Sequence, residues 1–177
     1  FLRENNAEIG VGKYGEARSF YSAKEFLNNS IDGEEKRTIH LGIDVFAPSG
    51  TSIYTPIDGV VHQLQDNQSE LDYGPTVILR HKITDGPEFY TLYGHLGREC
   101  LKQLEIGQVI KGGMQLTKIG NSNENGGWIP HVHFQLILDL FDYEGNYPGV
   151  ALPSGKKFWS SICPDPGFML SLDSEST

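Results

Sequence analysis

Short runs of β-branched and aromatic residues, separated at close intervals by glycine and proline, constrain the fold of this chain more than any other feature. Its 177 residues include 21 glycines and 9 prolines. Glycine and proline favour turns, whereas valine, isoleucine, tyrosine, threonine and phenylalanine favour strands. The pattern therefore predicts an all-β domain with many turns.

The expected strands cover most of the middle of the chain. They are residues 39–46, 52–54, 59–64, 76–81, 89–95, 109–110, 115–119 and 131–138. Helix signals are few. Residues 22–25, Ser-Ala-Lys-Glu, form a capping box that predicts a helix start ahead of Phe26, because serine and glutamate side chains can bond the free amides of a first turn. Residues 98–104 predict a second short helix with Leu101 and Leu104 on one face.

Charge and hydropathy narrow the classes of partner. The 23 acidic residues outnumber the 14 basic ones and give a net charge of −9. No basic cluster is larger than the pair Lys36-Arg37, so we expect no nucleic acid partner. The longest apolar run, residues 134–140, is too short to span a membrane.

The segment Pro130-His131-Val132-His133-Phe134 places two histidines one residue apart in an apolar run. Alternate side chains of a strand leave opposite faces of a sheet, so both imidazoles would share one face while Val132 and Phe134 enter the core. Burying two imidazoles without polar partners is costly. The pair therefore favours a polar or metal-binding site on this strand.

A second pattern, His40-Leu41-Gly42-Ile43-Asp44, places a histidine and a carboxylate on one strand face, with Gly42 between them. An extended strand would separate the Cα atoms of His40 and Asp44 by about 13 Å, too far for one ion with bonds of about 2.0–2.2 Å. Gly42 would have to permit a bend. With one histidine of the 131/133 pair, the set becomes two imidazoles and one carboxylate, which suits an open catalytic zinc site. The other histidine of the pair and His95 could then move protons or stabilise an oxyanion.

Other residues near these motifs have plainer interpretations. His62 is most simply a strand histidine without a role, and His81 a structural one. Tyr93, which shares the expected strand face of His95, is more often a core residue than a proton donor. Trp128 is either a packing residue or a platform for substrate.

The chain resembles the lysostaphin-type zinc metallopeptidases, which include glycyl-glycine and murein endopeptidases. The resemblance rests on four segments in order, HLGIDVFAPSGTSIYTPIDGVV, YTLYGHL, GQVIKGGMQLTKIG and PHVHFQ. It implies an antiparallel β core of the duplicated hybrid motif type with one or two short helices and a metal in a groove across the sheet.

Carried over by motif, the resemblance implies that His40, Asp44 and His133 ligate one Zn²⁺, while His95 and His131 act as catalytic groups. The reaction would be hydrolysis of a peptide bond by metal-activated water, in a peptidoglycan crosslink or in another peptide. The sequence has no HExxH glutamate, so histidines must serve as acid and base.

The chain also departs from the commonest pattern of that family. The loop over residues 121–130 is longer and carries asparagine and tryptophan, and we expect Trp128, Asn125 and Tyr93 to contact the substrate. Residues 139–168, beyond the last core strand, together with residues 13–18 and 125–128, resemble a module of large bacterial fusion proteins with phosphotransferase-like and aminotransferase domains. That likeness implies neighbouring domains and favours the cytoplasm over the cell envelope.

We expect one metallopeptidase-like domain in three parts. They are an N-terminal extension over residues 1–38, a catalytic β core over 39–138, and a C-terminal excursion and tail over 139–177. Because the sequence begins with phenylalanine, we expect it to be a processed product or a piece of a longer chain. Its two cysteines, Cys100 and Cys163, have no CxxC pattern and could form one disulfide or remain thiols.

Two alternative functions stay open at this point. The first is a peptidase-like binding or regulatory module that retains zinc without turnover, which the altered loop over residues 121–130 favours. The second treats His40, Asp44 and His133 as the two-histidine, one-carboxylate iron site of an oxygenase. The order of HxxxD followed by HxH matches the peptidase better.

Overall fold

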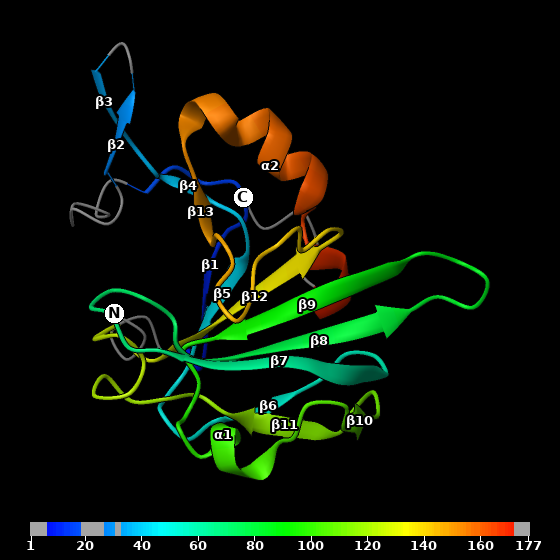
Figure 1. The fold of residues 1–177 in the computed structure, drawn as a ribbon. Helices are drawn as coiled ribbons and strands as arrows, with labels where there is room; N and C mark the ends of the chain where they lie inside the picture. Colours follow the sequence, from blue (N-terminus) through cyan, green and yellow to red (C-terminus); the bar gives the residue numbers. More distant parts are fainter. Residues whose placement is uncertain (1–6, 19–26, 31–32, 172–177) are drawn as a thin grey trace.

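The computed structural model describes residues 7–18, 27–30 and 33–171, which form a mainly antiparallel β structure (Figure 1). The strands are β1 (Gly10–Gly12), β2 (Leu27–Ser30), β3 (Gly33–Lys36), β4 (Ile39–His40), β5 (Ile43–Phe46), β6 (Ser52–Tyr54), β7 (Gly59–Asn67), β8 (Gly74–Lys82), β9 (Glu88–Gly94), β10 (Val109–Ile110), β11 (Gln115–Lys118), β12 (His131–Ile137) and β13 (Val150–Ala151). The helices are α1 (Cys100–Gln103) and α2 (Lys156–Ile162), with 3₁₀ turns η2 (Pro153–Gly155) and η3 (Gly167–Leu170). The predicted all-β class with short helices is confirmed.

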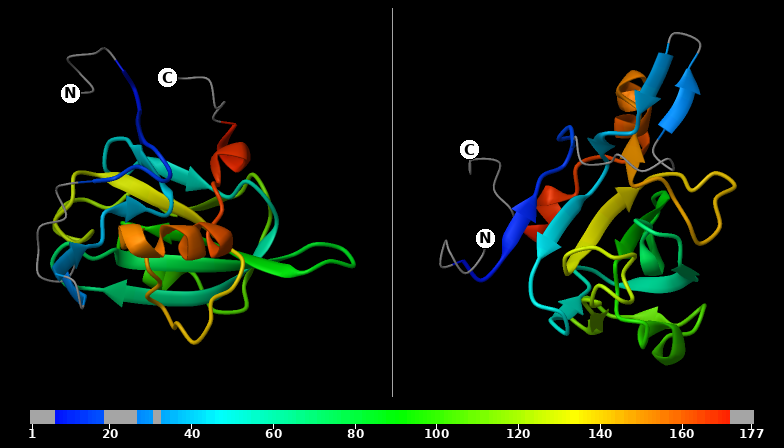
Figure 2. Two further views of the ribbon diagram at one scale, coloured as in Figure 1. Left: turned by 90° about the horizontal axis from the view of Figure 1, so that it is seen from above. Right: turned by 90° about the vertical axis from the view of Figure 1, so that its left-hand side faces the viewer.

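A seven-stranded antiparallel sheet, in the order β1-β5-β12-β9-β8-β7-β10, separates two hydrophobic clusters (Figures 1 and 2). Neighbouring residues of β8 alternate between them, as the pleat of a strand requires. Val77 and Leu79 join the cluster that includes residues of β6, β11 and α1, whereas Ile78 joins the cluster that includes residues of β4, β13 and Cys163. The sheet is therefore covered on both faces.

Strand β12 lies between β5 and β9 and sets the position of the site. Its His133 is paired with Asp44 of β5 on one side and with Gly94 of β9 on the other. Val132 and Phe134 are buried in the cluster with β6 and β11, while His131 and His133 both approach Asp44. The alternation predicted for the histidine pair is confirmed.

The strand predicted over residues 39–46 is divided in two by a bend. Strand β4 ends at His40 and pairs with β13, whereas β5 begins at Ile43 and pairs with β1 and β12. A Cβ atom at Gly42 would lie 2.6 Å from the Phe134 carbonyl oxygen and 2.7 Å from the His133 ring. Glycine is therefore required here by the close approach of β12, and the bend it allows brings His40 to Asp44.

Elements outside the core were harder to predict. Strand β1, which is Gly-Val-Gly, has little intrinsic strand preference and exists because it pairs with β5. Strands β2, β3 and β13 and helix α2 were likewise not expected. The helix predicted over residues 98–104 is confirmed in a shorter form as α1, and the helix start predicted at residues 22–25 lies outside the described residues.

The described part of the chain contains neither a membrane-spanning helix nor a disulfide. No helix in it is long and apolar enough to cross a membrane. Cys100 and Cys163 are both buried and free of any disulfide. Of the two states that the sequence left open for these cysteines, the structure has the thiols.

His81 is a structural histidine near the end of β8, away from the histidine pair on β12. Its Nδ1 donates to the Asp58 carbonyl and its Nε2 accepts from the Thr91 hydroxyl, both at 2.7 Å. Both ring nitrogens are thus satisfied by a neutral imidazole. Burial lowers the pKa of His81, because charging a buried ring costs desolvation energy.

The Gly42→Ala variant should lose about 1–3 kcal/mol of unfolding free energy, because the added methyl group forces β5 and β12 apart. Gly97→Ala is a matched control, since a Cβ there would meet its nearest atom at an ordinary 3.6 Å. Chemical denaturation of both variants measures the difference. Equal stability of the two would show that position 42 has room for a side chain.

Acid should destabilise the protein partly through His81. Its folded-state pKa lies below the unfolded value of about 6.5, so as pH falls below that value the unfolded state takes up the proton first and stability decreases, by at most about 1.4 kcal/mol per pH unit. Denaturant titrations of the metal-free protein between pH 7 and pH 5 should give a shallower pH dependence for His81→Gln. Parallel curves for the two proteins would contradict this prediction.

Candidate metal centre

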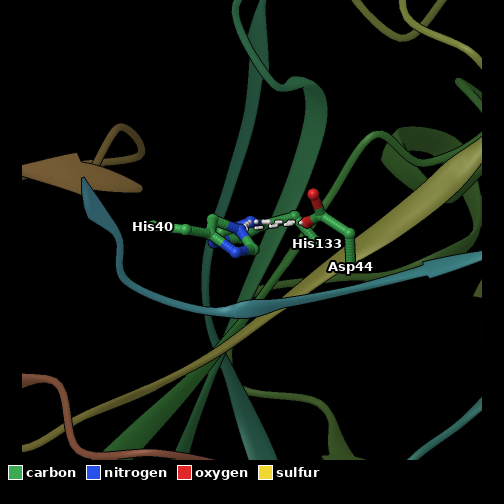
Figure 3. A group of neighbouring side chains, drawn as sticks. All are labelled: His40, Asp44 and His133. Carbon is green, nitrogen blue, oxygen red and sulfur yellow. Dashed lines mark hydrogen bonds and ion pairs between the residues drawn. The ribbon is translucent and has the colours of Figure 1, made fainter. Parts of the chain in front are cut away.

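His40, Asp44 and His133 converge on one buried point above the sheet (Figure 3). His133 Nδ1 lies 3.0 Å from His40 Nε2 and 3.0 Å from Asp44 Oδ1, and these last two atoms are 3.2 Å apart. Ligands of a tetrahedral ion with bonds of about 2.0–2.1 Å lie about 3.3 Å from one another. The three atoms therefore form a triangle of nearly the size that one metal ion requires.

The chemistry of the three donors also calls for a cation. His40 Nδ1 donates to the Lys13 carbonyl at 3.0 Å, and His133 Nε2 donates to Gln135 Oε1 at 2.9 Å. These bonds leave a lone pair on the inner nitrogen of each ring. Two lone pairs and a carboxylate oxygen then meet without a proton between them, and a bound cation removes their repulsion. The residues present thus fit a metal ion.

Arg18 holds Asp44 from the side opposite the two imidazoles. Its Nη1 lies 2.5 Å from Asp44 Oδ2, both side chains are buried, and its Nε lies 2.6 Å from Glu16 Oε1. The buried Arg18 guanidinium favours the charged form of the Asp44 carboxyl group. The carboxylate is therefore ionised, with one oxygen bound to Arg18 and the other facing the histidines.

His95 and His131 lie side by side next to these three residues, with ring centroids 4.2 Å apart. Nδ1 of His95 donates to the Asn125 carbonyl at 3.0 Å, and Nδ1 of His131 donates to the Ile129 carbonyl at 2.6 Å. The lone pair of each ring is therefore on Nε2, which in His131 lies 3.8 Å from Asp44 Oδ2. Burial lowers the pKa of both, and for His95 the neighbouring histidines lower it further. Both rings are neutral at pH 7.

The backbone at His95 differs from the regular strand that would have placed Tyr93 and His95 on one face. His95 follows the last residue of β9 with a φ of 62°, a left-handed conformation that is uncommon outside glycine and ends the alternation of the strand. Tyr93 consequently does not share a face with His95. It is buried in the hydrophobic cluster against Phe134 and is not among the residues that line the cavity over the histidines.

Asn125 and Trp128, which were both expected to contact substrate, occupy different positions in the loop before β12: Trp128 lines the cavity and Asn125 does not. Asn125 is fully buried; its side chain accepts from the Trp128 amide at 3.0 Å and donates to the Trp128 carbonyl at 3.1 Å. It therefore fixes the loop and His95, and is not in the cavity lining. Trp128 does line the cavity, with its indole Nε1 donating to the Asp72 carbonyl at 3.2 Å.

A cavity of about 560 Å³ is lined by four of the five site residues, Asp44, His95, His131 and His133. Its walls come from residues 69–73, residues 146–150 and Trp128 with Ile129. Tyr73 contributes a ring whose centroid is 5.3 Å from that of His133 and 5.5 Å from that of His95. Tyr73 and Arg18 could not be predicted from the sequence, because neither belongs to a histidine motif.

Fold and site together define a class of protein, an antiparallel β domain with a buried cluster of two histidines and one aspartate that could hold a metal ion. The model of the family described as Peptidase family M23 matches residues 38–142, more than half of the chain. The chain therefore belongs to peptidase family M23.

Two curated relatives are similar to the chain in sequence, and one solved structure is similar to it in fold. Peptidoglycan DD-endopeptidase ShyC of Vibrio cholerae is 33% identical over 100 residues, which cover 56% of this chain and 20% of ShyC. DD-carboxypeptidase/endopeptidase Mpg of Neisseria meningitidis is 34% identical over 116 residues, 66% of this chain and 24% of Mpg. The chain thus matches only a fifth to a quarter of the length of these relatives. The catalytic domain of lysostaphin from Staphylococcus simulans shares the fold, with a TM-score of 0.56, 20% identity and 94% of each chain covered.

In the metal-free protein, Arg18→Met should lower the free energy of unfolding by about 3–5 kcal/mol, because it leaves the buried Asp44 carboxylate without a charge partner. Arg18→Lys keeps a cation and should recover part of the loss. Saturating divalent metal should reduce the penalty, since the ion supplies the missing charge. Denaturation with and without chelator tests this, and a penalty unaffected by metal would contradict it.

Proposed function

We propose that the protein is a zinc-dependent metalloendopeptidase whose substrates are peptides of the peptidoglycan-crosslink class. Membership of peptidase family M23 and the endopeptidase names of two relatives support this proposal. The observation that carries it is the convergence of three atoms that could bind one metal ion, beside two further neutral histidines. A site built only to retain a metal has no need of the second pair.

Zinc suits the donor set, because two imidazoles and one carboxylate leave a fourth position open. When bound, zinc would polarise the scissile carbonyl and lower the pKa of a coordinated water to about 7. His40 and His133 would hold it through Nε2 and Nδ1, and Asp44 through Oδ1.

His131 is suited to hold the proton that the attacking water releases. Its Nε2 carries the lone pair, and Asp44 Oδ2 at 3.8 Å stabilises the imidazolium that results. The same nitrogen can then deliver the proton to the departing amine. His95, whose Nε2 is likewise an acceptor, would orient the attacking water.

The cavity walls would hold the peptide on either side of the histidines. Trp128 and the exposed Ile129 offer an apolar surface at one side, and Tyr73 offers a second ring beside His133. A cytoplasmic location, which the resemblance to fusion-protein modules favours, would call for another peptide as substrate. Assays should therefore include both crosslinked muropeptides and a general peptide library.

Removal of metal should abolish peptide hydrolysis, and added zinc should restore it. The protein is dialysed against a chelator, its metal content is measured by elemental analysis, and hydrolysis is followed by mass spectrometry before and after zinc is added. Hydrolysis that persists in the metal-free protein would refute the proposal. Dependence on iron and oxygen would favour the oxygenase alternative.

The His131→Ala variant should bind one zinc ion as the wild type does, yet lose about 10²–10⁴ in kcat, because proton transfer is lost while the ligands remain. His62→Ala is the matched control, since His62 lies outside this site against Tyr90 and should keep wild-type activity. A wild-type protein that binds zinc but cleaves no member of either substrate set would instead be a metal-retaining binding module.

A further inference from the structure

Gln135 is a fully buried amide two residues after His133 on β12. Its Oε1 accepts the Nε2 proton of His133 at 2.9 Å. Its Nε2 donates to the Pro148 carbonyl at 3.1 Å and to Cys163 Sγ at 3.2 Å. Both ends of the amide therefore have partners, and the metal-ligating histidine is one of them.

The partners of the amide nitrogen decide which way the amide faces. Pro148 offers a carbonyl oxygen, which can only accept, and burial raises the pKa of Cys163 to about 11, so its sulfur stays a thiol that serves as a weak acceptor. Two acceptors on one side place the NH₂ group there and turn Oε1 toward His133. A carbonyl facing His133 requires the proton of that imidazole to be on Nε2.

Reversal of the amide would change the chemistry of His133. An NH₂ group in place of Oε1 would need a lone pair on His133 Nε2, and the proton of a neutral ring would then move to Nδ1. That nitrogen lies 3.0 Å from both His40 Nε2 and Asp44 Oδ1. A proton there would fill the position at which a metal ion has to bind.

The residues that orient the amide belong to the C-terminal segment, beyond the family match at residues 38–142. Cys163 follows α2; its amide bonds the Trp159 carbonyl at 2.7 Å, and its carbonyl accepts from the Tyr14 hydroxyl at 2.6 Å. Pro148 lies in the cavity wall just before β13. Strand β13 and helix α2 are thus placed to affect the metal ligand from a distance (Figure 1).

We propose that Gln135 is a positioning residue that holds His133 in its metal-binding tautomer, and that Pro148 and Cys163 set the orientation of its amide. The C-terminal segment is then part of the metal centre and not an appendage of the core. This inference rests on the metal centre of the proposed function.

The test measures two quantities in the full chain, the zinc dissociation constant by chelator competition and the tautomer of His133 in the metal-free protein by ¹⁵N NMR. The wild type should show a protonated Nε2 and an unprotonated Nδ1. Gln135→Leu should bind zinc about 10–100-fold more weakly and show a mixture of tautomers. Gln135→Glu, which keeps an oxygen acceptor for the Nε2 proton, should stay closer to the wild type in both measurements.

Cysteine variants test the orientation of the amide. Cys163→Ala removes one of two anchors and should weaken zinc binding less than Gln135→Leu does, while Cys163→Ser should retain it. Cys100→Ala is the matched control, because Cys100 is an equally buried thiol in the other hydrophobic cluster; it should lose stability without losing zinc affinity.

Two outcomes would overturn the inference. One is a folded Gln135→Leu protein with the wild-type tautomer and unchanged zinc affinity. The other is an equal loss of affinity in Cys100→Ala and Cys163→Ala, which would indicate general destabilisation. If the wild type itself binds no zinc, the proposed function fails, whereas the tautomer measurement on the metal-free protein still decides the role of Gln135.

Discussion

Three hydrogen-bond acceptors within 3.2 Å of one another, buried and with no proton between them, are the constraint on which the rest of the structure depends. Buried lone pairs and a buried carboxylate repel each other strongly in a medium of low polarity. Such a cluster keeps its geometry only if each member is held from outside. The surrounding elements are arranged to do this for His40, Asp44 and His133.

The holding contacts follow a single rule for all four histidines of the site. Each ring donates its outer N–H to an oxygen, and the four oxygens come from different places in the chain. They belong to Lys13, Asn125, Ile129 and Gln135. The N-terminal segment, the loop before β12 and β12 itself therefore share the task of fixing the tautomers. Local displacement of any of these segments would change which nitrogen can act as a ligand or a base.

Much of this centre could be predicted from the sequence, because its residues lie on strands with a regular period. The alternation of β12 places His131 and His133 together, and Gly42 indicates the bend that joins His40 to Asp44. The strand period does not extend to His95, and the prediction that depended on it was wrong. The left-handed backbone of His95 turns its ring away from the face of Tyr93.

Contacts made across long separations in sequence left no local signal. The ion pair of Arg18 with Asp44 joins residues 26 positions apart, and the Gln135 contact with Cys163 joins residues 28 apart. Neither Arg18 nor Cys163 belongs to one of the histidine motifs. The position of Asn125 in its loop could not be predicted either, because its buried hydrogen bonds to Trp128 and His95 depend on the path of the backbone.

The ion pair between Arg18 and Asp44 has a consequence for the order of events in maturation. A carboxylate that already has a counter-ion on one oxygen can be buried before any metal arrives. The domain can therefore fold first and acquire its ion afterwards, in contrast to small zinc domains in which metal binding and folding are one event. Loading then becomes a separate step, governed by access through the cavity and by the supply of metal where the folded protein resides.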